Sequence, residues 1–223
     1  MQGEVLRLGG TAASQVPAVG PDSAPGMSGW ASAASAIYAV RRMPTPVLLR
    51  IDVVGTGSVL LDPRVAGYGG GVPIESLPAE PTAIRVETHP VDGAESEVTE
   101  DQAEFDGLMW FIGQHAFGDA RATWLWPNDR YKITRWPGVT RIALGLDEIR
   151  LFAALATTHL SLEELAAAAS VDERHAQRAL NALSLMGVLE TSSSAPPPTP
   201  RAPETARGAT RGLFGRLRAR LGI

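Results

Sequence analysis

The chain contains no cysteine among its 223 residues. This absence excludes a disulfide framework, a thiol nucleophile and a thiolate metal site, so nothing in the composition calls for an oxidising compartment. Long apolar runs are missing as well, and none approaches the ~18 residues that a membrane-spanning helix needs. We therefore expect a chain that works in the cytoplasm.

Recognisable catalytic constellations are also missing. The four histidines are scattered, without a second histidine or a carboxylate at the spacing of a metal motif; they are His89, His115, His159 and His175. The glycine-rich stretch 67–71 is followed by no Lys-Ser or Lys-Thr pair, as a phosphate-binding loop requires, and we interpret it as a turn. We predict no catalytic residues, no metal and no cofactor, and therefore a protein that is not an enzyme.

Both ends of the chain have the composition of unstructured segments. Ala, Gly, Ser and Pro dominate residues 1–42, which we interpret as a disordered leader or as sequence upstream of a true start at Met43. Residues 192–210 are rich in proline, which favours an extended linker over a packed core. The folded part is therefore expected between these segments.

Residues 43–142 have the pattern of a small α+β module. Two apolar runs with β-branched residues, VLLRIDV and SVLLD, flank a Gly-Thr-Gly turn at 55–57 and predict a β-hairpin. Residues 82–88 alternate enough to add a strand. Between 101 and 117 the apolar residues recur at helical spacing, which predicts a helix that packs on the sheet.

Four of the five tryptophans lie between Trp110 and Trp136, and residues 117–142 carry five basic residues against two acidic ones. A tryptophan cluster most often forms a core, here with arginine side chains along its rim. A protein interface is the second interpretation, and a platform for stacking bases is the third. The residues that we assign to partner contact in this stretch are Trp124, Trp126, Arg130 and Arg135.

Residues 143–191 predict three helices followed by a strand. Two Ser-x-x-Glu capping boxes, beginning at Ser161 and Ser170, mark the starts of the second and third helices. Gly187 supplies a helix stop, and residues 188–189 begin the first strand of a wing. The first helix is expected over 147–157, with apolar residues Ile149, Phe152, Ala153 and Leu155.

The segments LSLEELA (160–166) and RALNALSLMGVL (178–189) resemble the winged helix-turn-helix superfamily, whose regulators carry the pattern L-S-x-x-E-L-A followed by R-x-L-x-x-L. The resemblance implies a winged-helix fold for residues 147–191. The superfamily contains modules that bind DNA and modules that bind proteins. The charges of this segment therefore decide between two functions.

Charge favours a protein partner, because the region 143–192 carries seven acidic residues against three basic ones. A recognition helix in the major groove needs basic residues near its start, since phosphate neutralisation supplies much of the affinity for DNA. The helix here instead begins with two acidic residues, and we assign Asp172, Glu173, Arg174 and Arg178 to partner contact. The alternative is a ligand-sensing transcription regulator that reads operator DNA through Arg174, Gln177, Arg178 and Asn181.

Residues 211–223 form a basic amphipathic pattern. If this segment is helical, its large apolar residues fall within about 100° of arc, with arginines on both sides. The net charge is +5 from residue 195 onward and −9 before it. Such a helix can bind an anionic membrane surface, an acidic groove on a partner, or the acidic body of the chain. The residues assigned to this contact are Leu213, Phe214, Arg216, Leu217, Arg218, Arg220 and Leu221.

The segments LLDP (60–63), WPNDRYKITRWP (126–137) and GLFGRL (212–217) are similar to uncharacterised proteobacterial proteins associated with small Ras-like gliding-motility GTPases. This resemblance implies a GTPase or its roadblock-type regulator as partner, and a role in surface motility or polarity. We expect an α+β bacterial adaptor without catalysis, which binds protein partners through its body. Its C-terminal helix would tether it, at the periphery of the inner membrane in one of the three cases above.

Overall fold

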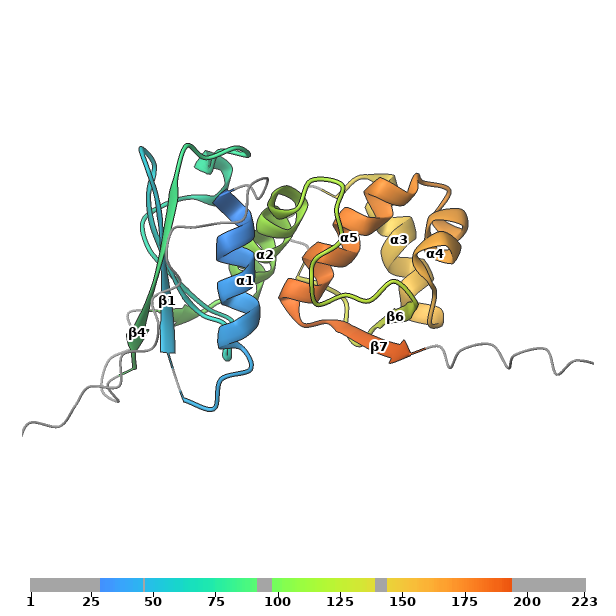
Figure 1. Cartoon of the computed structure of the whole chain (residues 1–223), viewed down its shortest axis with the longest axis horizontal. Coiled ribbons are helices and arrows are strands. Elements are labelled where there is room, and N and C mark those ends of the chain that lie inside the picture. The colour runs from blue at the N-terminus through green and yellow to red at the C-terminus, as the bar shows by residue number, and fades with distance from the viewer. Residues whose placement is uncertain (1–28, 46, 92–97, 139–143, 194–223) are drawn as a thin grey trace, which may run out of the picture. The chain divides into compact units, whose positions relative to one another are not determined.

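A computed structural model describes residues 29–45, 47–91, 98–138 and 144–193 of the chain (Figure 1). These residues form an α+β fold, as predicted, and those up to Ser192 belong to one compact unit. No helix among them is long and apolar enough to cross a membrane. The elements in chain order are α1 (Gly29–Val40), β1 (Val47–Val53), β2 (Gly57–Asp62), β3 (Gly67–Gly69), the 3-10 helix η1 (Ile74–Ser76), β4 (Ile84–Pro90), β5 (Thr99–Glu100), α2 (Gln102–Ala116), β6 (Asp129–Ile133), α3 (Leu146–Thr157), α4 (Leu162–Ala169), α5 (Glu173–Met186) and β7 (Leu189–Ser193).

The larger sheet has the strand order β4-β1-β2-β3-β5 and is antiparallel throughout. The predicted hairpin lies at its centre, with Leu49 opposite Leu61, and Gly55 in the turn has a positive φ of 82° that glycine adopts without strain. Along β1, Leu49 and Ile51 are buried whereas Arg50 between them is exposed. The sheet therefore has one core face and one solvent face.

The glycine stretch 67–71 is only partly the predicted turn, because its first half is the strand β3, which pairs with β2. Glycine suits this position because the neighbouring backbone is close. A Cβ on Gly70 would lie 2.6 Å from the carbonyl oxygen of Ser58. The stretch therefore allows two backbones to approach closely. The alternation of apolar and polar side chains could not predict β3, because two of its three residues are glycines.

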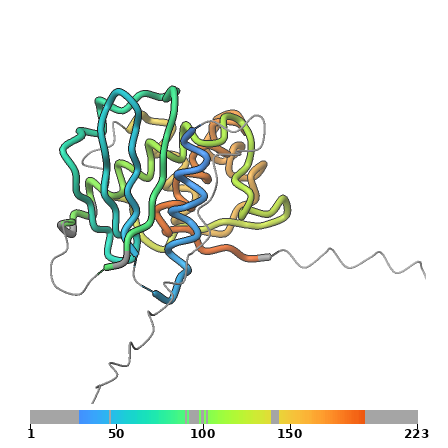
Figure 2. The backbone as a smooth tube through the Cα atoms, turned by 60° about the vertical axis from the view of Figure 1, so that its left-hand side comes forward, coloured from blue at the N-terminus to red at the C-terminus, as the bar shows by residue number. Residues whose placement is uncertain are grey.

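The helix α1 corrects the prediction of an unpacked leader for residues 29–40, whereas residues 1–28 lie outside the described part of the chain. Helix α1 lies along the core face of the sheet (Figure 2), and its Trp30 is buried. Trp30 donates its indole N–H to the Pro78 carbonyl at 2.9 Å and meets the Phe111 ring edge-on at 5.3 Å. A chain that started at Met43 would lack this helix. Composition hides α1 because most of its buried residues are alanines, which favour helix but resemble a low-complexity leader.

One hydrophobic core joins the sheet to the helices that follow it. The helix α2, confirmed near its predicted position, packs on α1 and the sheet on one side and on α5 on the other (Figure 1). The contact with α5 is close because Gly113 has no side chain: a Cβ there would lie 2.3 Å from Ala182 Cα. The predicted modules 43–142 and 143–191 therefore share one core.

The predicted helix pair α4 and α5 is present, with one of its two capping boxes. Ser161 accepts from the Glu164 N–H and the Glu164 side chain returns to the Ser161 N–H, as predicted. The second box is wrong, because Ser170 is left-handed (φ 57°) and ends α4. Asp172 caps α5 instead, accepting from the His175 N–H at 2.8 Å.

The strand predicted after α5 is present as β7, and Gly187 ends α5 in the left-handed conformation, as predicted. β7 pairs with β6, which precedes all three helices in the sequence. Tyr131 of β6 also forms a bridge with Leu160, between α3 and α4. A second wing strand would lie beyond Ser193, outside the described residues. β6 thus ties the stretch after α2 into the helical part.

Candidate functional site

Trp124, predicted to contact a partner, instead joins three parts of the fold. Its ring stacks on Tyr38 of α1, with centroids 4.1 Å apart and planes 12° apart. Its indole N–H donates to Ser184 Oγ of α5 at 2.9 Å. Phe117 meets the same ring edge-on at 5.5 Å. Trp124 is therefore a packing residue, as the core interpretation of the tryptophan cluster predicts.

Arg130 holds the loop between α3 and α4. Its guanidinium donates two hydrogen bonds to the His159 carbonyl, at 3.2 and 3.1 Å, and pairs with Glu164 at 2.5 Å. The contact fixes β6 against the start of α4. Arg130, assigned above to partner contact, is thus engaged within the chain.

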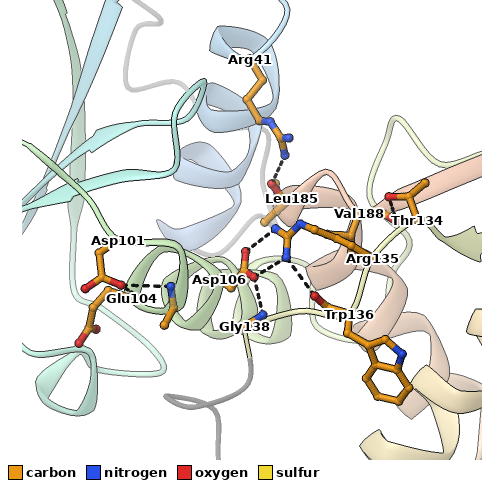
Figure 3. Close-up of polar contacts among 11 residues, drawn as sticks. Arg41, Asp101, Glu104, Asp106, Thr134, Arg135, Trp136, Gly138, Leu185 and Val188 are labelled. Carbon is orange, nitrogen blue, oxygen red and sulfur yellow. Dashed lines mark hydrogen bonds and ion pairs between the residues drawn. The ribbon is translucent and has the colours of Figure 1, made fainter.

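Arg135 binds a buried carboxylate on α2 (Figure 3). Two of its nitrogens donate to Asp106, at 2.8 and 2.9 Å, and the Gly138 N–H donates to the same carboxylate at 2.6 Å. Asp106 has no exposed side-chain surface. The hydrogen bonds to Asp106 raise the pKa of the Arg135 guanidinium, outweighing the opposite effect of burial. Arg135 therefore anchors the segment after β6 to α2.

The start of α5 is organised by local contacts. The hydrogen bond from the His175 backbone N–H lowers the pKa of Asp172, the N-cap. Arg174 and Arg178 both approach Asp119, at 3.6 and 3.9 Å. Glu173 is exposed and lies in the first turn, where the helix dipole favours an acid. These four assigned residues thus lie together near the start of α5, and three of them have partners within the chain.

Two of the four residues proposed for DNA recognition are buried beneath the loop that follows α2. Asn181 is fully buried; its Oδ1 accepts from the Ala122 N–H and from Gln177 Nε2, both at 3.0 Å. Its Nδ2 donates to the Ala120 carbonyl at 3.0 Å. Gln177 is 5% exposed. A helix that reads base edges must expose such residues, so in this structure α5 has no open face at these two positions.

An exposed apolar surface lies on α3 and the segment after β6. It consists of Trp136, Leu146 and Ile149, which we term the α3 surface; their exposed fractions are 52%, 62% and 46%. The Trp136 ring lies edge-on to buried Phe152, with centroids 6.1 Å apart, so it rests on the core beneath α3. Exposed clusters of large apolar side chains mark interaction sites on soluble proteins.

The α3 surface adds two features that the sequence analysis did not assign. Of the four apolar residues named for the expected helix, Ile149 and Ala153 are exposed, and the buried residues of the helix are Leu151, Phe152 and Leu155. Trp136 was not assigned to partner contact. The sequence did contain a signal for this surface, because the apolar residues of α3 lie on two sides of the helix. One side packs on the core, and the other is then free to contact a partner.

Trp126, unlike Trp124, lies at the surface, with 69% of its area exposed. The Tyr131 hydroxyl donates to its carbonyl at 2.9 Å, which fixes the loop that carries it. The residues assigned to partner contact in the body therefore do not form one site. Trp124 packs inside the fold, Arg130 and Arg135 form internal ion pairs, four residues lie at the start of α5, and Trp126 is exposed. The assigned residues of 211–223 lie outside the described part of the chain.

Within the four described ranges, no three His, Asp or Glu side chains are grouped so that they could hold a metal ion. Comparisons with protein-family models, with curated proteins and with solved structures give no match for this chain. The two likenesses drawn from sequence motifs therefore stay predictions. What bears on function is the geometry described above.

Proposed function

We propose that this chain is a non-catalytic adaptor that binds a protein partner through the α3 surface. The observation that carries the proposal is the exposure of Leu146 and Ile149 on α3 together with Trp136, whose ring packs against Phe152 of the same helix. Tryptophan beside aliphatic residues is typical of the energetic centre of protein interfaces. Phe152 supports the Trp136 ring, and Arg135 donates to the Trp136 carbonyl at 3.1 Å. Little side-chain freedom is then lost on binding.

The surroundings of the cluster suit a protein interface. Asp147 and Arg150 lie on the same helix and pair at 3.3 Å, with about half of each side chain exposed. They provide a polar rim next to the apolar centre, which is the usual arrangement of a non-obligate interface. The partner is expected to offer an apolar patch of its own. A small Ras-like GTPase or its roadblock-type regulator is the partner that the sequence resemblance implies.

DNA binding is the alternative function, and two observations disfavour it. Gln177 and Asn181 are buried, which removes half of the proposed base-reading set from the surface of α5. The chain before residue 195 carries a net charge of −9, which repels phosphates. The acidic start of α5 adds to this repulsion. A cytoplasmic protein-binding role is the proposal that fits these charges.

We expect Ile149→Lys to weaken partner binding at least about 30-fold, because a charge in the centre of an interface is desolvated without a partner. The matched control is Val54→Lys, which places the same charge at another exposed β-branched apolar residue, in the turn between β1 and β2. The partner is first captured on the full chain, then purified and titrated against both variants. Equal affinity of the two variants contradicts the assignment of the surface.

The same preparation tests the DNA alternative. Retention of the chain on duplex DNA at physiological salt, unchanged when residues 212–223 are deleted, would overturn the adaptor proposal in favour of a transcription regulator. The deletion matters because arginines at the C-terminus bind phosphate backbones regardless of fold. If the chain is no longer retained on DNA after residues 212–223 are deleted, DNA binding by the rest of the chain is contradicted.

We further propose that the basic segment 211–223 tethers the adaptor to an anionic membrane surface. The full chain is expected to sediment with vesicles that contain anionic lipid and not with neutral vesicles, since each arginine near such a surface adds about 1 kcal/mol. Deleting residues 212–223 removes the effect, and replacing Leu213 and Leu217 by serine weakens it while keeping every arginine. Sedimentation that survives the deletion, or that is equal with neutral vesicles, contradicts the tether.

A further inference from the structure

A cleft of about 410 Å³ opens between the end of α1, the turn between β2 and β3, and the end of α5. Three arginines line it: Arg41 after α1, Arg64 in the turn, and Arg135 after β6. They come from segments far apart in the sequence. Met186 and Gly187 at the end of α5 complete one wall. The fold thus gathers three guanidinium groups around one cleft.

Two of these arginines are oriented by buried carboxylates behind them. Arg64 donates from Nε to Asp62 at 2.8 Å and also from Nη2. Arg135 is held in the same two-point manner by Asp106. Asp62 and Asp106 are buried and are not among the residues that line the cleft. The carboxylates therefore fix the two guanidinium planes without filling the cleft.

Arg41 is held differently, against the backbone of α5. It donates to the Leu185 carbonyl at 2.5 Å (Figure 3), and its guanidinium lies so close to Gly187 that a Cβ there would be 1.7 Å from it. Burial lowers the pKa of Arg41, and the neighbouring Arg42 and Arg135 lower it further. An arginine stays charged under such shifts, so three cations line the cleft, and two of them are hydrogen-bonded to carboxylates outside the lining.

Donors remain available in the cleft. Each guanidinium has five N–H groups. Among the described residues, the guanidinium of Arg41 donates one hydrogen bond to a protein acceptor. That of Arg64 donates two, and that of Arg135 donates three. The wall of the turn also contains Ala66, a non-glycine residue with φ of 51°. Such backbone strain is found at ligand sites more often than elsewhere.

We propose that this cleft binds the phosphoryl group of a small phosphate-bearing molecule. Planar arginine forks match tetrahedral oxyanions and donate two hydrogen bonds at a time, which a single lysine cannot do. The positive charge of the lining arginines supplies the attraction. The volume holds a phosphoryl group together with part of the molecule that carries it. The cleft contains none of the three residues of the α3 surface, although Arg135 in its lining precedes Trp136, and the inference does not depend on the adaptor role.

The test is calorimetric titration of the full chain with pyrophosphate and with inorganic phosphate, at constant ionic strength. We expect Arg41→Gln to weaken pyrophosphate binding at least about tenfold, because it removes the lining cation whose described hydrogen bond goes to a backbone carbonyl and not to a carboxylate. The matched control is Arg85→Gln on β4, an exposed arginine that does not line the cleft. Its affinity is expected to stay within about twofold of the parent chain.

Arg41 also contacts the end of α5, so a second variant keeps the proposal testable if Arg41→Gln does not fold. Arg64→Lys retains the charge next to Asp62 but loses the planar fork, and we expect about a fivefold loss of affinity. Two outcomes overturn the site. One is pyrophosphate binding no stronger than that of chloride. The other is binding that both cleft variants leave intact, including binding that disappears only on deletion of residues 212–223, which would assign it to the C-terminal arginines.

Discussion

Gly113→Ala is expected to lower the free energy of unfolding by about 3 kcal/mol, although alanine is the better helix former. The new Cβ would lie 2.3 Å from Ala182 Cα and 2.6 Å from Ala182 N. Both are backbone atoms of α5, so no side chain can rotate away. The helices α2 and α5 must separate instead, and the contacts along their length loosen. This cost exceeds the gain of about 1 kcal/mol in helix propensity.

Urea unfolding followed by far-UV circular dichroism measures the effect. The matched control is Gly71→Ala, where a Cβ would meet nothing within 4 Å and the backbone φ is ordinary. We expect the control to change stability by less than about 0.5 kcal/mol. If the two variants unfold at the same urea concentration, the close packing of α2 on α5 is contradicted.

The shared core has a second consequence for the same experiment. Tryptophans occur on both sides of the α2–α5 contact: Trp30 lies in α1 beside the sheet, and Trp124 contacts α5. Because one core joins these parts, fluorescence and circular dichroism should report a single transition in the parent chain. Gly113→Ala weakens the junction, so any separation of the two transitions should appear in that variant first.

Local signals in the sequence located the elements whose formation depends on near neighbours. The Gly-Thr-Gly turn predicted the β1–β2 hairpin, and apolar spacing predicted α2 within a residue or two of its bounds. Ser161 and Gly187 marked real helix ends. Each of these features is set by backbone preferences over a few residues, which is why a sequence pattern is enough.

Features that depend on distant contacts were not predictable in this way. Trp30 is buried because helix α1 packs on a sheet whose strands follow it in the sequence. The close contact at Gly113 depends on Ala182, about seventy residues further along the chain. Asn181 looked like a base-reading residue because its helix position is right for that role. Its hydrogen bonds to Ala120 and Ala122, about sixty residues away, could not be seen in the pattern.

At the candidate site, too, features set by distant contacts could not be predicted from the sequence. Trp126, which was assigned to partner contact, is exposed, and so is Trp136, which was not assigned although it belongs to the same tryptophan cluster. Exposure is decided by what lies above a side chain, and periodicity reports only which residues share a face. The three arginines of the cleft are separated by long stretches of chain, so nothing in the sequence placed them together.

Arg135→Gln is expected to lower the free energy of unfolding by about 3 kcal/mol at neutral pH. The substitution removes the two charge-assisted hydrogen bonds that Arg135 donates to the fully buried Asp106 carboxylate, while the Gly138 N–H at 2.6 Å still donates to it. The reverse change, Asp106→Asn, should cost less, about 1 to 2 kcal/mol. Its amide oxygen still accepts a hydrogen bond, and the partly exposed Arg135 is hydrated.

The matched control is Arg130→Gln, which removes an arginine from the same part of the chain. Arg130 pairs with the exposed Glu164, so losing it leaves no buried charge, and the expected change is about 1 kcal/mol or less. Urea unfolding at neutral pH compares the three variants. If Arg130→Gln and Arg135→Gln are equally destabilised, Asp106 is hydrated in solution and the buried ion pair is contradicted.

Arg135 also connects stability to the proposed partner surface. It donates to the carbonyl of Trp136, and its bonds to Asp106 fix the segment that presents the Trp136 ring to solvent. Arg135→Gln should therefore weaken partner binding under conditions where the variant is still folded, without any change to a side chain of the α3 surface. Arg130→Gln should leave partner binding unchanged, because Arg130 anchors the start of α4 instead. Equal partner affinity of the folded Arg135→Gln variant and the parent chain would show that Trp136 does not take part in the interface or is held by Phe152 alone.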